Sequence, residues 1–278
     1  MVRATGLEVV GIPVDEEGIR VDLLDRAKVD AVVVTPAHQY PTGGVLPPDR
    51  RAALVAWAVR RRGLIVEDDY DAEFRYDREP IGAVQGLCPD YVVYAGSASK
   101  ILAPGLRLGW LVPPTRLVES IAQMKQAADQ GSAALDQLAF ADFVASGELD
   151  RHLRRVRPIY RRRRDALLSA LARHLPDLQP VGASAGLHFL AWLPRELDEE
   201  TLVRSGAEAG VGLGGLAAER IARGDRGAIV FGYGSVAESA INNGVRRLAS
   251  VVSALTHVQR PVRRKRGRSG REGSEPPS

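Results

Sequence analysis

Short apolar runs alternate with amphipathic segments through the first half of the chain. Asp30–Pro36, Leu64–Asp69 and Tyr91–Ser97 are continuous runs rich in β-branched residues, which is typical of strands covered on both faces of a sheet. Between the first two runs, residues 47–62 have a helical pattern with proline at the start and Gly63 as the stop. This alternation predicts a largely parallel sheet flanked by helices.

The second half of the chain is first helical and then mixed. From Pro114 to about Leu175 the apolar positions recur at helical spacing, and Pro158 predicts a kink or break. The arginines of this stretch are predicted to form the solvated side of a long helix (Arg154, Arg155 and residues 161–164). Further strands are predicted at residues 108–113, 185–194 and 227–234, and a closing helix at residues 236–255.

The composition is that of an ordinary globular protein, with 45% apolar and 26% charged residues. No apolar run approaches the roughly 18 residues that a membrane span needs. Residues 1–7 lack the apolar stretch of a secretory signal. The single cysteine, Cys88, excludes an intramolecular disulfide and a cysteine-rich metal site. We therefore expect a cytoplasmic protein with no membrane partner and no metal.

The net charge of +4 is concentrated in the tail, residues 257–278, which holds seven Arg or Lys against two Glu. The rest of the chain is not basic. Because the tail is rich in Gly, Pro and Ser and has no apolar periodicity, it is predicted to be disordered. It favours a solubilising role, and weak contact with nucleic acid or membrane is the alternative.

Three polar stretches follow the first three predicted strands: TPAHQYPTGG (35–44), EDDYDAEF (67–74) and GSASK (96–100). The carboxyl ends of parallel strands share one edge of a sheet, where ligands bind. Lysine is scarce, with only 4 among 38 basic residues, so Lys100 stands out as the amine of this edge. A pyridine cofactor with an aldehyde and a phosphate needs an amine, a carboxylate, a phenol and hydroxyl plus guanidinium groups. Together these stretches favour pyridoxal 5'-phosphate (PLP).

The motifs TPAHQYPTGG, EDDYDAEFRYD and GSASKILAPGLRLGWLV resemble the aminotransferase domain of MocR-type regulators of the GntR class. The resemblance covers about residues 7–255 and implies the fold-type-I, aspartate-aminotransferase-like α/β fold of PLP-dependent enzymes. It implies that PLP is held as a Schiff base on Lys100. It assigns the pyridine nitrogen to Asp68, although Asp69 is adjacent. It also implies that the remaining cofactor-binding residues are Tyr70 at the ring oxygen, Ser97 and Arg107 at the phosphate, Tyr40 in place of the family's asparagine, and His38 or Gln39 in the pocket lining.

The same resemblance implies a division of the chain. Residues 1–130 would be part of a PLP-binding large domain, and residues 131–256 a linking helix with a small C-terminal domain. Family members carry further aminotransferase residues and a winged helix ahead of the point that matches Met1. We therefore expect a chain truncated at its N-terminus, with exposed sheet edges and apolar surface. DNA would be bound only through a winged-helix domain absent from this chain, and a homodimer is implied.

Three functions are compatible with these residues. The first is the effector-sensing part of a MocR-like regulator, the second an active transaminase, and the third a truncated remnant that binds no cofactor. The ligand would be a small amine or amino acid. The resemblance places a substrate-carboxylate arginine at Ala228, and the nearby Arg226 lies about 7 Å along the strand, so the ligand's identity stays open.

Overall fold

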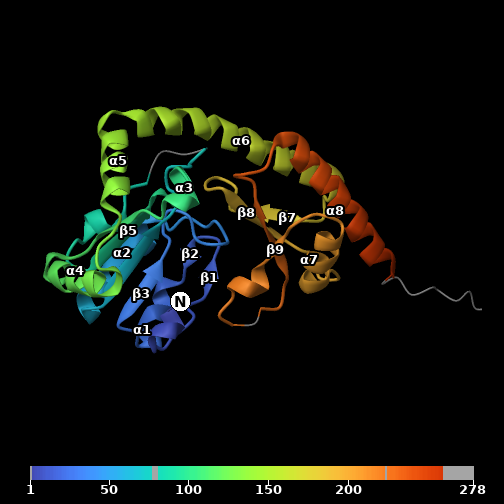
Figure 1. The fold of residues 1–278 in the computed structure, drawn as a ribbon. Coiled ribbons are helices and arrows are strands. Elements are labelled where there is room, and N and C mark those ends of the chain that lie inside the picture. The colour runs from blue at the N-terminus through green and yellow to red at the C-terminus, as the bar shows by residue number, and fades with distance from the viewer. Residues whose placement is uncertain (1, 77–80, 223, 259–278) are drawn as a thin grey trace, which may run out of the picture.

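The computed structural model describes residues 2–76, 81–222 and 224–258. It contains two four-stranded sheets that lie side by side beneath one long helix, α6 (Glu148–His174), which spans both of them (Figure 1). The first sheet comes from the N-terminal half of the chain and the second from the C-terminal part. This arrangement is the predicted α/β architecture. Residues 259–278 of the basic tail lie outside the described residues, while 257 and 258 form the end of the last helix.

The first sheet has the strand order β3-β4-β5-β6. Its strands are β3 (Ala31–Val34), β4 (Leu64–Asp69), β5 (Val92–Ser97) and β6 (Gly109–Val112). The pairs β3–β4 and β4–β5 are parallel, and β6 runs antiparallel to β5. The carboxyl ends of β3, β4 and β5 therefore meet at one edge, as the sequence predicts.

Helix α2 (Pro48–Arg61) covers one face of the first sheet. It begins with Pro48 and ends at Arg61, with Arg62 as its C-cap, so the helix predicted there is confirmed. Its apolar side packs into a core with alternate strand residues (Leu54, Trp57 and Ala58 with Val32, Ile65 and Val92). The prediction that both faces are covered is wrong for the outer strands, since Val33 is 60% exposed and Leu111 51% exposed.

Helices α4 (Thr115–Asp129) and α5 (Ala134–Ala145) connect the first sheet to α6, and neither buries a single residue. Helix α6 continues without interruption through Pro158, so the predicted break is absent. The prediction that all its arginines are solvated is wrong for Arg164, which is 5% exposed. Its guanidinium stacks 4.9 Å from the ring centre of Tyr76 and donates to the carbonyl of Ala183.

The second sheet is antiparallel, with the strand order β7-β8-β10-β9. Its strands are β7 (Gln179–Val181), β8 (His188–Trp192), β9 (Gly214–Gly215) and β10 (Ala228–Gly232). Helices α6, α7 (Glu199–Glu208) and α8 (Glu238–Val258) pack against one face of it. This is the largest apolar core of the described residues, and it contains Phe189, Ile229 and Leu248.

Several short elements complete the fold. A two-stranded hairpin, β1 (Val14–Asp15) and β2 (Gly18–Ile19), precedes α1 (Leu24–Ala27), and α3 (Ala98–Ile101) follows β5. Single 3-10 turns are Val2–Thr5, Val21–Leu23, Val84–Leu87, Pro104–Leu106 and Leu216–Glu219. Across the described ranges, no helix has the length and apolar character needed to cross a membrane.

Candidate active site

The candidate site lies where the ends of β3, β4 and β5 meet the turn between β7 and β8 (residues 182–187, called the β7–β8 turn below). This turn is bound to the segment after β4 by backbone hydrogen bonds: Gly186 N–H donates to Phe74 O at 2.8 Å, and Tyr76 N–H to Ser184 O at 3.2 Å. The carbonyl of Gly186 accepts two phenol hydrogen bonds, each 2.8 Å, from Tyr76 and Tyr233. Residues more than a hundred positions apart thus form one wall of the site.

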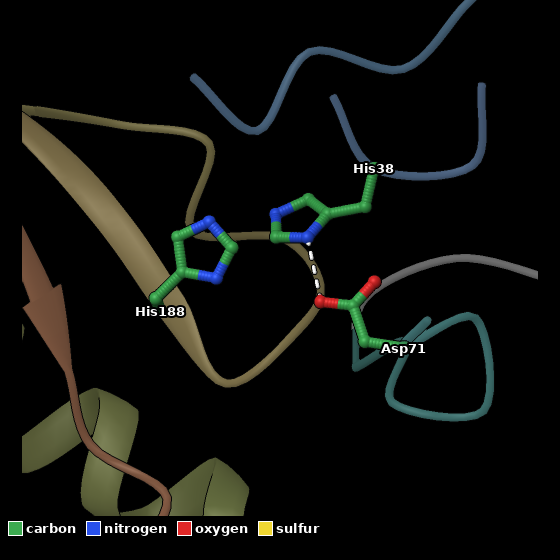
Figure 2. Close-up of side chains that lie close together, drawn as sticks. All are labelled: His38, Asp71 and His188. Atoms are coloured by element: carbon green, nitrogen blue, oxygen red, sulfur yellow. Dashed lines mark hydrogen bonds and ion pairs between the residues drawn. The ribbon is translucent and has the colours of Figure 1, made fainter. Parts of the chain in front are cut away.

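His38 occupies the centre of this contact. It follows β3 and is 2% exposed. Its Nδ1 lies 2.8 Å from Oδ2 of Asp71 (Figure 2). Its Nε2 lies 3.2 Å from the carbonyl oxygen of Gly182. The hydroxyl of Tyr70 donates to the backbone carbonyl of His38 at 3.1 Å and is 3.2 Å from Nδ1. The structure therefore brings His38 and Tyr70 together, as the sequence predicts. The contacts between them could not be read from the sequence.

His188, at the start of β8, faces His38 across the site (Figure 2). The ring centres are 4.9 Å apart, and the ring of Tyr40 lies 5.3 Å from that of His188. Burial, followed by the charges of His38 and Lys100, lowers the pKa of His188 to about 3, so its imidazole is neutral near pH 7. Its buried Nε2 has no hydrogen-bond partner in the described part of the chain.

Ligand atoms of His38, Asp71 and His188 all lie within 4.8 Å of one another. Zinc binds nitrogen and oxygen at about 2.0–2.2 Å and would have to displace the hydrogen bond between His38 and Asp71. We therefore describe this set as a hydrogen-bonded cluster and assign no metal to it.

The two adjacent aspartates at the end of β4 have different environments. Because side chains alternate along a strand, Asp68 and Asp69 point to opposite faces. The carboxylate of Asp69 accepts a 3.0 Å hydrogen bond from the hydroxyl of Tyr94. Among the described residues, none donates to Asp68. Partial burial, then the charges of Asp69 and Asp71, raise the pKa of Asp68, although the residue as a whole keeps solvent contact.

Lys100 lies in the one-turn helix α3, directly after β5. This helix is capped by Ser97, whose hydroxyl oxygen accepts from Ser99 N–H at 3.1 Å. The amine of Lys100 is exposed and has no hydrogen bond or ion pair within the described ranges, yet it is close enough to His188 to affect that pKa. The lysine thus lies at the same edge as Tyr70 and His188.

The remaining predicted residues are less closely connected to the cluster. Tyr40 is 43% exposed, and its ring meets that of Tyr70 edge to face at 6.1 Å. Partial burial and then Glu219 raise the pKa of Tyr40. Arg107 is exposed, with a left-handed backbone at φ 53°, and none of its described contacts reaches the cluster. The phosphate roles of Arg107 and Ser97 stay predictions.

Burial, then the charges of Asp71 and Asp68, raise the pKa of Tyr70, which keeps its phenol protonated and able to donate. The site thus offers an unpaired amine, an unpaired carboxylate and a phenol donor at one sheet edge. These groups fit a pyridine ring that carries an aldehyde and a hydroxyl, since each would meet a complementary atom.

The Aminotransferase class I and II family model matches residues 1–221. The chain belongs to that family. It is similar to "Uncharacterized HTH-type transcriptional regulator YhdI" of Bacillus subtilis, at 36% identity over 92% of this chain and 55% of that protein. It is also similar to "HTH-type pyridoxine biosynthesis transcriptional regulator PdxR" of Corynebacterium glutamicum, at 35% identity over 90% of this chain and 54% of that protein.

Similar solved structures support the assignment of the chain to this family. The multiple substrate aminotransferase of Thermococcus profundus matches with a TM-score of 0.83 and 30% identity, over 90% of this chain and 65% of that one. LysN, the α-aminoadipate aminotransferase of Thermus thermophilus, solved with N-(5'-phosphopyridoxyl)-L-leucine, matches with a TM-score of 0.85 and 28% identity, over 92% and 68%. The predicted aminotransferase fold and the resemblance to MocR-type regulators are confirmed. The chain spans about half the length of the curated relatives it matches.

Proposed function

We propose that this chain binds PLP at the candidate site and serves as the effector-sensing part of a MocR-like transcriptional regulator. The observation that carries the proposal is the pair of unpaired charges at one sheet edge. Among the described residues, neither the Lys100 amine nor the Asp68 carboxylate has a partner, while the phenol of Tyr70 is held in place beside them. The names of the regulators that share about a third of its residues support the regulatory half of the proposal.

Each residue has a role that its chemistry allows. The Lys100 amine would attach the cofactor covalently, Asp68 would pair with the ring nitrogen, and Tyr70 would donate to the ring oxygen. Ser97 and Arg107 would hold the phosphate, and Tyr40 and His38 would line the pocket. When bound, PLP supplies a carbon that reacts with amines and a ring that accepts electrons.

The proposed effector is a small amine or amino acid. Strand β10 is Ala-Ile-Val-Phe-Gly, so it carries no guanidinium to hold a carboxylate. Arg226 does not replace one, because its guanidinium donates to Leu193 O at 3.0 Å and Gln179 Oε1 at 2.9 Å and stacks on Trp192. We assign DNA contact to a winged helix that is not among these residues, and we propose a homodimer, which sedimentation of the PLP-loaded chain would test.

The visible absorbance of the purified chain with PLP tests the proposal, followed by borohydride reduction and peptide mapping. We expect a band in the visible region, a reduced adduct on Lys100, and loss of both in Lys100→Ala. Lys125→Ala is the matched control, since Lys125 is an exposed lysine paired with Asp129 on α4. A folded chain with no band, or an adduct on another lysine, would contradict the proposal and favour a remnant that binds no cofactor.

The second candidate function is catalytic transamination, which the similarity to the solved aminotransferases favours. Turnover with an amino donor and a keto-acid acceptor separates the two, because the acceptor must take the amino group from the cofactor before a second donor can react. Conversion of the bound cofactor once per chain, without further keto product, is expected for a sensor. Many product molecules per chain would identify an enzyme.

A further inference from the structure

The side chain of His188 turns away from the core of the second sheet. Phe189, the next residue along β8, packs into the largest apolar core. Because side chains alternate along a strand, His188 points the other way, toward the loops at the end of the first sheet. Figure 2 shows it facing His38, at 4.9 Å between ring centres. The rings of Tyr40 and Tyr70 lie at 5.3 Å and 6.3 Å, so His188 belongs to the candidate site.

The imidazole of His188 carries its one proton on Nδ1. A hydrogen bond joins the ring to the backbone of Pro41, and proline has no N–H, so the partner is a carbonyl oxygen and the ring is the donor. Nε2 has no partner in the described part of the chain, so the donating nitrogen is Nδ1. Since the ring is neutral near pH 7, Nε2 holds a lone pair and can only accept a hydrogen bond.

The rings around His188 do not supply the donor that Nε2 lacks. The Nε2 atom of His38 faces a carbonyl oxygen at 3.2 Å, and the hydroxyl of Tyr70 donates to the backbone carbonyl of His38 at 3.1 Å. The hydroxyl of Tyr40 pairs with the carboxylate of Glu219. His188 is only 9% exposed. Buried polar groups are normally hydrogen-bonded, so an acceptor without a protein donor is suited to a ligand that brings one.

Two neighbours of His188 are exposed, Lys100 and Tyr40. Lys100 is close enough to His188 to affect its pKa, and Tyr40 is 43% exposed, whereas His38 on the opposite side is 2% exposed. A small molecule held at Lys100 therefore meets the imidazole from this open side. In the proposed function, that molecule is the effector.

We propose that His188 is a specificity-determining residue whose Nε2 accepts a hydrogen bond from the hydroxyl group of a small amino alcohol bound beside Lys100. The inference rests on the proposed function, which places the amine of the effector at Lys100. A carboxylate in the same position has no proton to give, and its oxygens would face the lone pair of Nε2. Strand β10 agrees with this selection, because it carries no guanidinium that would hold such a carboxylate.

A second ammonium group is a poorer donor to Nε2 than a hydroxyl. Burial is the main cause that lowers the pKa of His188, followed by the charges of His38 and Lys100. The same surroundings disfavour a further positive charge, whereas a neutral hydroxyl can be buried once it is hydrogen-bonded. The site therefore selects an amino alcohol over both an amino acid and a diamine.

The proton assignment is tested first, in the cofactor-free chain, by long-range ¹⁵N–¹H correlation of the histidine rings. The chain has five histidines, and His188→Leu identifies the signals of His188. We expect a proton on Nδ1 and none on Nε2 at pH 7. A proton on Nε2 would overturn the proposal, because this nitrogen would then donate. His152 is the internal comparison, since its Nε2 lies 2.9 Å from the carbonyl oxygen of Ile101 and must carry a proton.

The choice of ligand is tested by titrating the PLP-loaded chain with paired amines, followed by visible absorbance. The pairs are ethanolamine with propylamine and propanolamine with butylamine, in which a hydroxyl replaces a methyl group. For at least one pair, we expect the affinity ratio of hydroxyl to methyl member to be about tenfold higher in the parent chain than in His188→Phe. Comparing one pair in two chains cancels the different basicities of the amines. His188→Leu gives the same comparison if His188→Phe does not fold.

The matched control is His257→Phe, which replaces an exposed histidine of α8 and should keep the parent ratio. β-Alanine has a carboxylate where propanolamine has its hydroxyl, so it should gain affinity relative to propanolamine when His188 is replaced. Unchanged ratios in the His188 variants, with PLP on Lys100, would overturn the role of His188 and leave the proposed function standing. Binding of a water to Nε2 in place of a ligand gives this result. A folded chain that binds no PLP would overturn both.

Discussion

Replacement of Gly186 by alanine should break the contact between the two sheets. Gly186 has a φ of +77°, a left-handed conformation that alanine adopts at a cost of about 1–2 kcal/mol. Its new Cβ would lie 2.3 Å from Cε1 of His38 and 2.4 Å from Oδ2 of Asp71, well inside van der Waals contact. Neither partner can move aside freely, because both are 2% exposed and hydrogen-bonded to each other.

The expected loss follows from these two effects. Overfilling a packed site costs about 1–3 kcal/mol, so with the backbone term the variant should lose about 2–5 kcal/mol of unfolding free energy. The turn cannot relieve the overlap by shifting as a whole, since Gly186 is held by one backbone and two phenol hydrogen bonds. A domain of ordinary stability has about 5–15 kcal/mol in total, so the effect is large.

Urea unfolding of Gly186→Ala and Gly147→Ala, followed by fluorescence, separates the two effects. Gly147 has nearly the same φ, +75°, and a Cβ built on it meets nothing within 4 Å. Gly147→Ala should therefore lose only the backbone term of about 1–2 kcal/mol. If Gly186→Ala is no less stable than Gly147→Ala, the β7–β8 turn is not packed on His38 as described, and the argument for a rigid contact fails.

For three further substitutions, the structure determines whether the stability of the fold rises or falls. Burial lowers the pKa of His188 from 6.5 to about 3 in the folded chain. Between these two pH values the unfolded chain carries a proton on His188 that the folded chain does not bind. Stability should fall below pH 6.5 by up to about 1.4 kcal/mol per pH unit, and unfolding of His188→Phe should lack that contribution. Asp68→Asn should stabilise the cofactor-free chain at pH 7, because partial burial and two neighbouring carboxylates raise the pKa of Asp68 in the fold. This gain in stability should disappear as the pH falls through the raised pKa of Asp68 toward 3.8. A gain that does not change with pH would show that the charge of Asp68 is not its cause. Arg164→Ala should lose about 1–3 kcal/mol in thermal or urea unfolding, since it removes the stacking on Tyr76 and leaves the carbonyl of Ala183 without its donor. Exposed Arg154→Ala on the same helix should change stability by less than about 0.5 kcal/mol, and equal effects would refute the buried role.

The sequence predicts the edge of the first sheet well, because the information is local. Each of the three strands ends directly before a polar stretch, and parallel pairing then brings Tyr70 and the segment of Lys100 to one edge. The choice of Asp68 over Asp69 comes from the family resemblance, because strand alternation only places the two side chains on opposite faces. In the structure the carboxylate of Asp69 accepts a hydrogen bond from Tyr94, whereas the role of Asp68 stays a prediction.

The residues that sequence reasoning misses come from long-range packing. His188 looks like a core histidine of a β-strand, and nothing near it indicates that the second sheet brings it within 4.9 Å of His38. Gly182 and Gly186 give no signal either, since glycine is common in turns. Asp71 lies next to Tyr70 in the motif, and its adjacency is the one signal that could have selected it.

The prediction of two-sided cover fails for a different reason. An apolar run shows that a strand can be buried on both faces, but not which element covers it. Helix α2 covers the face with Val32 and Ile65, while Val33 and Leu111 on the other face stay exposed. The expected exposed apolar surface is therefore present at this sheet, and Arg164 shows the converse, a charge buried where the helical pattern predicts solvent.

The polar groups of the site fall into two sets with different consequences. His38, Asp71 and Tyr70 satisfy one another and the β7–β8 turn, so replacing them should lower stability and ligand affinity together. Lys100 and Asp68 have no partner among the described residues. Partial burial and the charges of Asp69 and Asp71 raise the pKa of Asp68, so its ionised form is less stable in the fold than in the unfolded chain. Replacing these two should abolish binding while leaving stability unchanged or higher. That opposition is what a ligand site requires, since groups that await a partner cost the fold stability that only the ligand restores.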